Sequence, residues 1–96
     1  MNTGSILQQR RSDILALAHR YGLRHVRVFG SAARGDVHTG SDVDFLVEPG
    51  PGVSIFDLGG FQFELQDLLG CHVDVVTEKG LRPRIRQRVL EEAVGL

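Results

Sequence analysis

Apolar side chains recur along the chain with two periods, one helical and one strand-like. Residues 5–21 follow the helical spacing, which predicts an amphipathic helix that ends near Gly22, a residue suited to a helix C-terminus. A second helical stripe covers residues 54–70 and begins at a serine that can cap its first turn. Gly59 and Gly60 lie inside this stripe, and each costs about 1 kcal/mol relative to alanine. This helix must therefore gain stability from packing, or bend there.

Three shorter segments alternate with a period of two and predict β-strands. They are His25–Phe29, Asp42–Glu48 and His72–Thr77, all rich in β-branched or aromatic residues. A last helix is expected after Gly80, because Pro83 is tolerated in a first turn. Ser31–Asp36 is short and rich in small residues, which indicates a brief helix or a turn. The order of these elements predicts one α/β or α+β domain, with three strands and helices on one face of the sheet.

Composition places the chain among ordinary globular proteins. Of its 96 residues 42% are hydrophobic and 24% charged, and the formal net charge is −1, which suggests neither a nucleic-acid nor a membrane partner. Cys71 is the only cysteine, so no disulfide can form within the chain. Residues 1–11 lack the pattern of a secretory signal, and no run approaches the ~20 apolar residues of a membrane span. The expected location is the cytoplasm.

Acidic residues occupy the strand faces that the apolar residues leave free. Asp42 and Asp44 share one face of their strand, and Asp74 lies on the corresponding face of the next strand. Carboxylates at positions i and i+2 lie about 6.5–7 Å apart, and they repel by roughly 2.5 kcal/mol in a partly enclosed cleft. A divalent cation such as Mg²⁺ reverses the sign of this interaction, because it takes oxygen ligands. Alternatively, Asp42 and Asp44 are solvated acids on an edge strand that discourage aggregation.

The dipeptide Gly30-Ser31 follows the first strand and is the second candidate feature. Gly30 allows a ligand to approach the backbone, and the amides that follow can hold a phosphate, with the Ser31 hydroxyl as a further donor. A plain turn with a serine cap is the alternative for an isolated Gly-Ser pair. No P-loop motif occurs in the chain. Arg34 either neutralises phosphate charge or is a surface arginine beside Asp36.

Two further groups of residues have simpler interpretations. The basic run near the C-terminus splits into the ridges Arg82/Arg86 and Arg84/Arg88, which favours a solvated helix face over a nucleic-acid stripe. Direct binding of nucleic acid is therefore not expected. His72 shares a strand face with Asp74, but the four histidines form no cluster in the sequence.

Together the motifs resemble a known family. Phe29–Gly35 (FGSAARG) followed by Ser41–Val47 (SDVDFLV) is similar to the signature of the DNA polymerase beta-type nucleotidyltransferase superfamily, and especially of its minimal nucleotidyltransferase branch. His72–Val76 (HVDVV) resembles the strand that supplies the third carboxylate. The resemblance extends over residues 23–96 and implies a catalytic core there, preceded by an N-terminal helix over residues 1–22. It also implies the minimal fold of that superfamily, with a three-stranded mixed sheet.

The resemblance implies a site and a reaction. Asp42 and Asp44 would bind two Mg²⁺ ions, and Asp74 would bind one of them and assist deprotonation of the acceptor hydroxyl. Gly30 and Ser31 would hold the phosphates of the nucleotide. The reaction would transfer AMP from ATP to a hydroxyl of a partner protein, because members of this branch resemble the antitoxins of HEPN-domain toxins and form hetero-oligomers with them.

Two other functions remain open at this point. The chain could neutralise its partner by binding and masking it, with the carboxylates dispensable. It could also modify a small molecule such as an aminoglycoside, although relatives of that kind usually carry a further helical domain.

Overall fold

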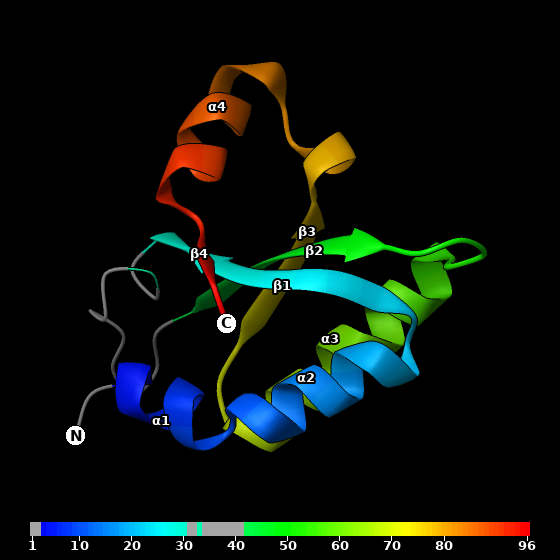
Figure 1. The fold of residues 1–96 in the computed structure, drawn as a ribbon, viewed down its shortest axis with the longest axis vertical. Coiled ribbons are helices and arrows are strands. Elements are labelled where there is room, and N and C mark those ends of the chain that lie inside the picture. Colours follow the sequence, from blue (N-terminus) through cyan, green and yellow to red (C-terminus); the bar gives the residue numbers. More distant parts are fainter. Residues whose placement is uncertain (1–2, 31–32, 34–41) are drawn as a thin grey trace.

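The computed structural model describes residues 3–30, 33 and 42–96, apart from the side chains of residues 3–5. Within these residues a mixed sheet is flanked by helices (Figure 1). The elements, in chain order, are α1 (Thr3–Gln9), α2 (Arg11–Arg20), β1 (Leu23–Phe29), β2 (Val43–Pro49), α3 (Ile55–Leu69), β3 (Val73–Thr77), the short 3₁₀ helix η2 (Glu78–Gly80), α4 (Pro83–Glu92) and β4 (Val94–Gly95).

Among the described residues the sheet contains four strands, in the order β3-β2-β1-β4. β1 pairs with β2 and β4 in the antiparallel direction, whereas β2 and β3 are parallel and are connected through α3. The predicted mixed α/β fold is therefore confirmed. The fourth strand was not predicted, because the two residues of β4 are too few to show an alternating pattern.

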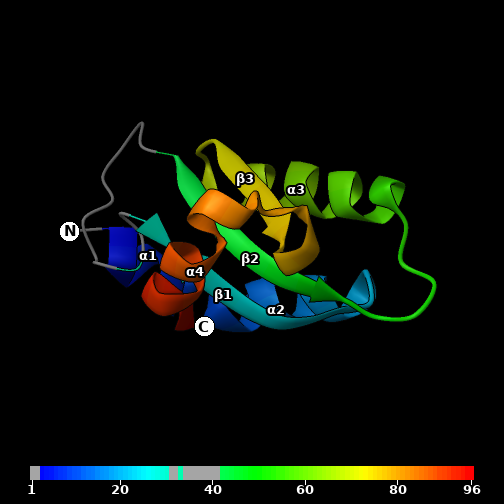
Figure 2. The same ribbon diagram turned by 90° about the horizontal axis from the view of Figure 1, so that it is seen from above.

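The main core lies between the sheet and the helices α2 and α3. Val43, Phe45 and Val47 point into it from β2 and are almost completely buried. Figure 1 shows α2 and α3 against this face, while Figure 2 shows α4 in front of the opposite face. The prediction that helices cover only one face thus needs a correction at α4. Leu46 also lies on the aspartate face and is 0% exposed, so this face carries buried apolar surface as well.

The N-terminal segment forms two helices where one was predicted. The interruption is at Arg10, whose backbone (φ −99°, ψ 8°) falls between α1 and α2. It lies within a run of polar residues from Gln8 to Ser12, which offers no apolar side chain to bury. On either side of the break Leu7 and Ile14 are buried in the core.

Helix α3 has the predicted boundaries. At its start the Ser54 hydroxyl accepts a hydrogen bond from the Asp57 amide at 3.4 Å, and the Asp57 carboxylate accepts one from the Ser54 amide at 2.8 Å. At its end Gly70 takes the left-handed conformation, with φ +69°. Gly60 lies where Tyr21 packs, because a Cβ atom there would be 2.9 Å from Cε1 of that ring. This glycine thus allows α2 and α3 to approach each other.

Candidate active site

The register between β2 and β3 brings the predicted carboxylates together. Asp44 lies directly beside Asp74, and Val43 lies beside Val73. β2 is an interior strand with a neighbour on each side. The alternative that Asp42 and Asp44 are protective acids on an edge strand is therefore wrong.

Two hydrogen bonds fix the beginnings of these strands. The Val43 amide donates to the carbonyl oxygen of His72 at 3.0 Å, which joins the start of β2 to the residue before β3. The Val73 amide donates to the side-chain carbonyl of Gln66 at 3.2 Å, which joins β3 to the last turns of α3. As a result Asp42 and His72 face each other across the two strands.

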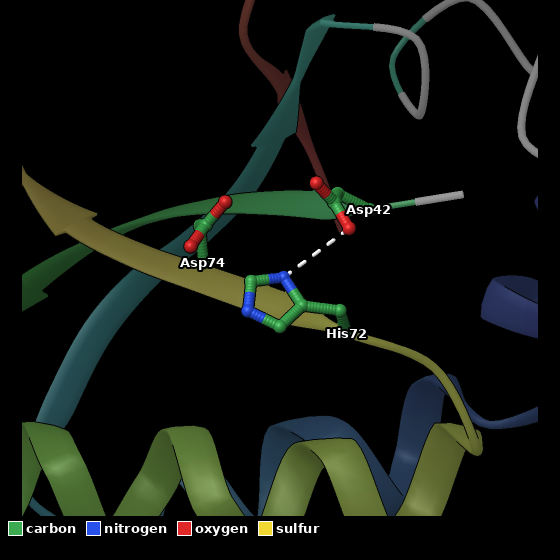
Figure 3. Close-up of side chains that lie close together, drawn as sticks. All are labelled: Asp42, His72 and Asp74. Atoms are coloured by element: carbon green, nitrogen blue, oxygen red, sulfur yellow. Dashed lines mark ion pairs between the residues drawn. The ribbon is translucent and has the colours of Figure 1, made fainter. Parts of the chain in front are cut away.

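Asp42, His72 and Asp74 form a compact cluster (Figure 3). One ligand atom from each residue can be chosen so that all three lie within 4.8 Å of one another. His72 Nδ1 is 3.2 Å from Asp42 Oδ1, and both side chains are more than half exposed. The cluster is therefore open to an ion and to a substrate from solvent.

Asp44 is half-buried on β2, like Asp74 on β3, whereas Asp42 is exposed. Burial raises the pKa of Asp44, and the negative charges of Asp74 and Asp42 raise it further, as does a hydrogen bond with Asp74, while His72 lowers it. The charged form of Asp44 is thus disfavoured in the protein alone. A cation among these oxygens would favour it, so the donor set fits a hard divalent ion such as Mg²⁺.

Gly30 lies at the end of β1, close to this group. Its φ is +66°, and a Cβ atom built on it would lie 3.1 Å from Oδ2 of Asp44. Both the backbone conformation and the close approach favour glycine at this position. Ser31 and Arg34, together with the predicted helix or turn over Ser31–Asp36, lie outside the described residues except for Ala33.

His72 is the member of the cluster that sequence reasoning did not select. The signal was present, because His72 precedes Asp74 by two residues and so shares its strand face. Its proximity to Asp42 depends on the pairing of two strands about thirty residues apart, which no local pattern reveals.

Other candidate residues have structural explanations. In the basic run, Arg86 pairs with Glu78 at 2.8 Å and Arg88 with Glu92 at 3.3 Å, both at the surface, as expected for a solvated helix face. Burial raises the pKa of the Cys71 thiol, followed by the charge of Asp42, which argues against a nucleophilic thiolate. Among the described helices, none has both the length and the apolar composition needed to cross a membrane.

Carboxylates on two adjacent strands, beside a glycine at the end of a third, form a donor set that fits a divalent cation next to a backbone that a ligand can approach closely. Comparison with known proteins identifies the class of protein. Residues 14–96 match the nucleotidyltransferase domain family. The chain belongs to this family and is an enzyme of the nucleotidyltransferase class.

Three similar proteins illustrate the relationship. "Protein adenylyltransferase MntA" of Thermococcus cleftensis is 38% identical over 90 residues, which are 94% of this chain and 88% of the relative. A solved structure described as a "putative minimal nucleotidyltransferase" is 44% identical, with a TM-score of 0.88 and coverage of 100% of this chain and 97% of the other. A toxin-antitoxin crystal structure with AMP-PNP shares the fold at 22% identity and a TM-score of 0.74, with coverage of 88% and 69%.

Proposed function

We propose that this chain transfers AMP from ATP to a hydroxyl group of a partner protein. The observation that carries the proposal is the convergence of Asp42, Asp44 and Asp74 beside Gly30 at one end of the sheet. The similarity to a protein adenylyltransferase supports AMP as the transferred group and a protein as the acceptor.

The three aspartates would hold two Mg²⁺ ions, with Asp42 and Asp44 as ligands of the ions and Asp74 as a ligand of one. When bound, such ions stabilise charge on the attacking oxygen and on the leaving pyrophosphate. In the transfer, the acceptor oxygen forms a bond to the α-phosphorus, and the bond from that phosphorus to the bridging oxygen breaks. Pyrophosphate leaves, and Asp74 accepts the proton of the hydroxyl.

The nucleotide phosphates would bind at the turn that follows β1. Gly30 presents no side chain beside Asp44, and the backbone amides that follow, with the Ser31 hydroxyl, would donate hydrogen bonds to a phosphate. Arg34 would neutralise part of the triphosphate charge. Ser31 and Arg34 enter this proposal from the sequence motif alone.

A protein partner, a HEPN-type toxin for which this chain would act as the antitoxin in the cytoplasm, completes the proposal. An exposed face of α3 supports a partner. Ile55, Phe56 and Phe63 lie on one side of this helix and are 77%, 86% and 72% exposed. Large apolar side chains gathered on one exposed face are typical of interaction surfaces. The helix contains acids and no basic residue, so a partner surface should be apolar and flanked by Lys or Arg.

The test compares the native chain with the variant D42N/D44N, each co-purified with the protein encoded beside it. With labelled ATP and Mg²⁺, we expect the native chain to label its partner and the double variant to lose at least about a hundredfold in rate, because ligands that act in the transition state are removed. Mass spectrometry should locate an added AMP on a hydroxyl side chain. No label with the native chain would contradict the transfer.

The same variant separates catalysis from masking. If D42N/D44N still neutralises the partner at native expression levels, binding alone is sufficient and the transferase is not the neutralising activity. If neutralisation is lost while the complex still forms, transfer is required. The control E48Q changes another carboxylate of the same strand, one that is exposed and paired with His25, and should behave like the native chain.

A further inference from the structure

The cluster at the start of β2 and β3 contains a nitrogen ligand, which an Mg²⁺ site does not require. His72 Nδ1 lies 3.2 Å from Asp42 Oδ1, and Asp74 completes a group whose ligand atoms are all within 4.8 Å of one another. Mg²⁺ is a hard ion that takes oxygen ligands and retains several waters. Imidazole instead suits Zn²⁺, Co²⁺ and related first-row transition ions.

We propose that Asp42, His72 and Asp74 form a mixed nitrogen-oxygen site that binds Co²⁺ and Zn²⁺ more tightly than Mg²⁺, with His72 as the residue that determines this preference. The inference shares Asp42 and Asp74 with the proposed function and rests on their being metal ligands. It does not rest on AMP transfer. The proposed transferase would then be sensitive to the identity of the divalent ion.

The geometry is compatible with one ion bound by all three side chains. Nitrogen and oxygen ligands of Zn²⁺ lie at about 2.0–2.2 Å, so two ligands of one tetrahedral ion are about 3–4 Å apart. The separation of 3.2 Å between His72 and Asp42 already falls in this range. Asp74, within 4.8 Å, can reach the same ion by a small rotation of its side chain.

Exposure also fits the proposal. The side chains of His72 and Asp42 are 56% and 62% exposed, so an ion can enter from solvent and keep a water or a substrate oxygen as a further ligand. Asp44, which is half-buried beside Asp74, adds negative charge next to these three residues. Removal of His72 should therefore change the type of ion preferred more than the overall attraction for cations.

A second histidine provides a matched control. His25 Nε2 is also 3.2 Å from a carboxylate oxygen, that of Glu48, and both side chains are exposed. Among the described residues, no third histidine, cysteine or carboxylate converges on this pair. His25 has a φ of +49°, a conformation that asparagine tolerates, so H72N and H25N are comparable changes.

The test measures Co²⁺ binding to the full chain without nucleotide or partner, from the visible absorption of the bound ion and by calorimetry. We expect the native chain and H25N to bind Co²⁺ equally, and H72N to bind it at least about tenfold more weakly. Mg²⁺ binding, followed by calorimetry, should change by less than about threefold in H72N. Unfolding curves establish that each variant is folded, which the exposure of both histidines favours.

The outcomes are distinguishable. Equal Co²⁺ affinity of H72N and the native chain, or tighter binding of Mg²⁺ than of Co²⁺ by the native chain, would overturn the role of His72. The variant D42N should lose both ions. If D42N instead binds Mg²⁺ and Co²⁺ like the native chain, the metal site itself is wrong, and with it the metal ligands of the proposed function.

Discussion

Asp44 lies half-buried on β2 between two other carboxylates, where its charge is unfavourable unless a cation is present. Burial is the largest cause of its raised pKa, followed by the charges of Asp74 and Asp42. A raised carboxylate pKa means that the folded protein holds a proton more tightly than the unfolded chain. Above that pKa the charged Asp44 therefore destabilises the fold, and the site is maintained at a cost in stability.

We therefore expect D44N to stabilise the protein when Mg²⁺ and nucleotide are absent. The gain should appear at pH 7 as a higher melting temperature, for which each 1 kcal/mol corresponds to about 4–8 °C in a chain of this size. The difference should shrink as the pH falls through the folded pKa of Asp44, because the native carboxyl then becomes neutral too. Thermal unfolding in a chelating buffer measures both effects.

The exposed Glu48 on the same strand is the control for this prediction. Its change to Gln removes a surface ion pair with His25 and should alter stability by less than about 1 kcal/mol. A melting temperature of D44N at or below that of E48Q would show that the charge of Asp44 is not destabilising.

At the scale of the elements, α3 contains two adjacent glycines with different surroundings. A Cβ atom on Gly59 would meet nothing within 4 Å, whereas one on Gly60 would lie 2.9 Å from the ring of Tyr21. That ring packs edge-on against Phe61, with centroids 6.2 Å apart, and its hydroxyl is hydrogen-bonded to Glu64. Tyr21 is therefore held on several sides and cannot move away easily.

This contrast predicts opposite effects of the same substitution. G59A should raise the free energy of unfolding by about 0.5–1 kcal/mol, because alanine restricts the unfolded chain and favours the helix. G60A should lower it by about 1–3 kcal/mol, because the added methyl group displaces Tyr21 and outweighs the helix propensity. Urea unfolding of both variants measures the difference. Stabilisation by G60A would mean that the contact between α2 and α3 adapts freely.

The same helix shows what the sequence could and could not reveal about elements. Ser54 and Gly70 mark the ends of α3 by local rules of capping, and the structure confirms them. The need for Gly60 was not visible, because it comes from Tyr21, about forty residues earlier in the chain. Likewise, alternation placed Asp44 and Asp74 on matching strand faces, while the meeting of Asp42 with His72 depends on strand register.

At the scale of the whole molecule, the sheet separates the core from the candidate site. α2 and α3 cover one face, while α4 lies over part of the other (Figure 2). Asp42, just before β2, is exposed. Leu46 is buried on this second face, which it shares with the aspartates. The alternating pattern placed Leu46 on the aspartate face. It did not show that this leucine is buried, because packing between distant elements depends on the full three-dimensional arrangement.

The apolar face of α3 leads to a prediction about assembly. The variant F56S/F63S removes two side chains that are 86% and 72% exposed, so the free energy of unfolding should change by less than about 0.5 kcal/mol per site. If this face binds the proposed partner, the association should weaken at least about tenfold, because aromatic side chains dominate such interfaces.

The control I85S removes an apolar side chain from α4 that is 45% exposed, and it should leave binding unchanged. Calorimetry or co-purification with the protein encoded beside this chain measures the effect. Equal binding by F56S/F63S and the native chain would place the interface elsewhere on the molecule.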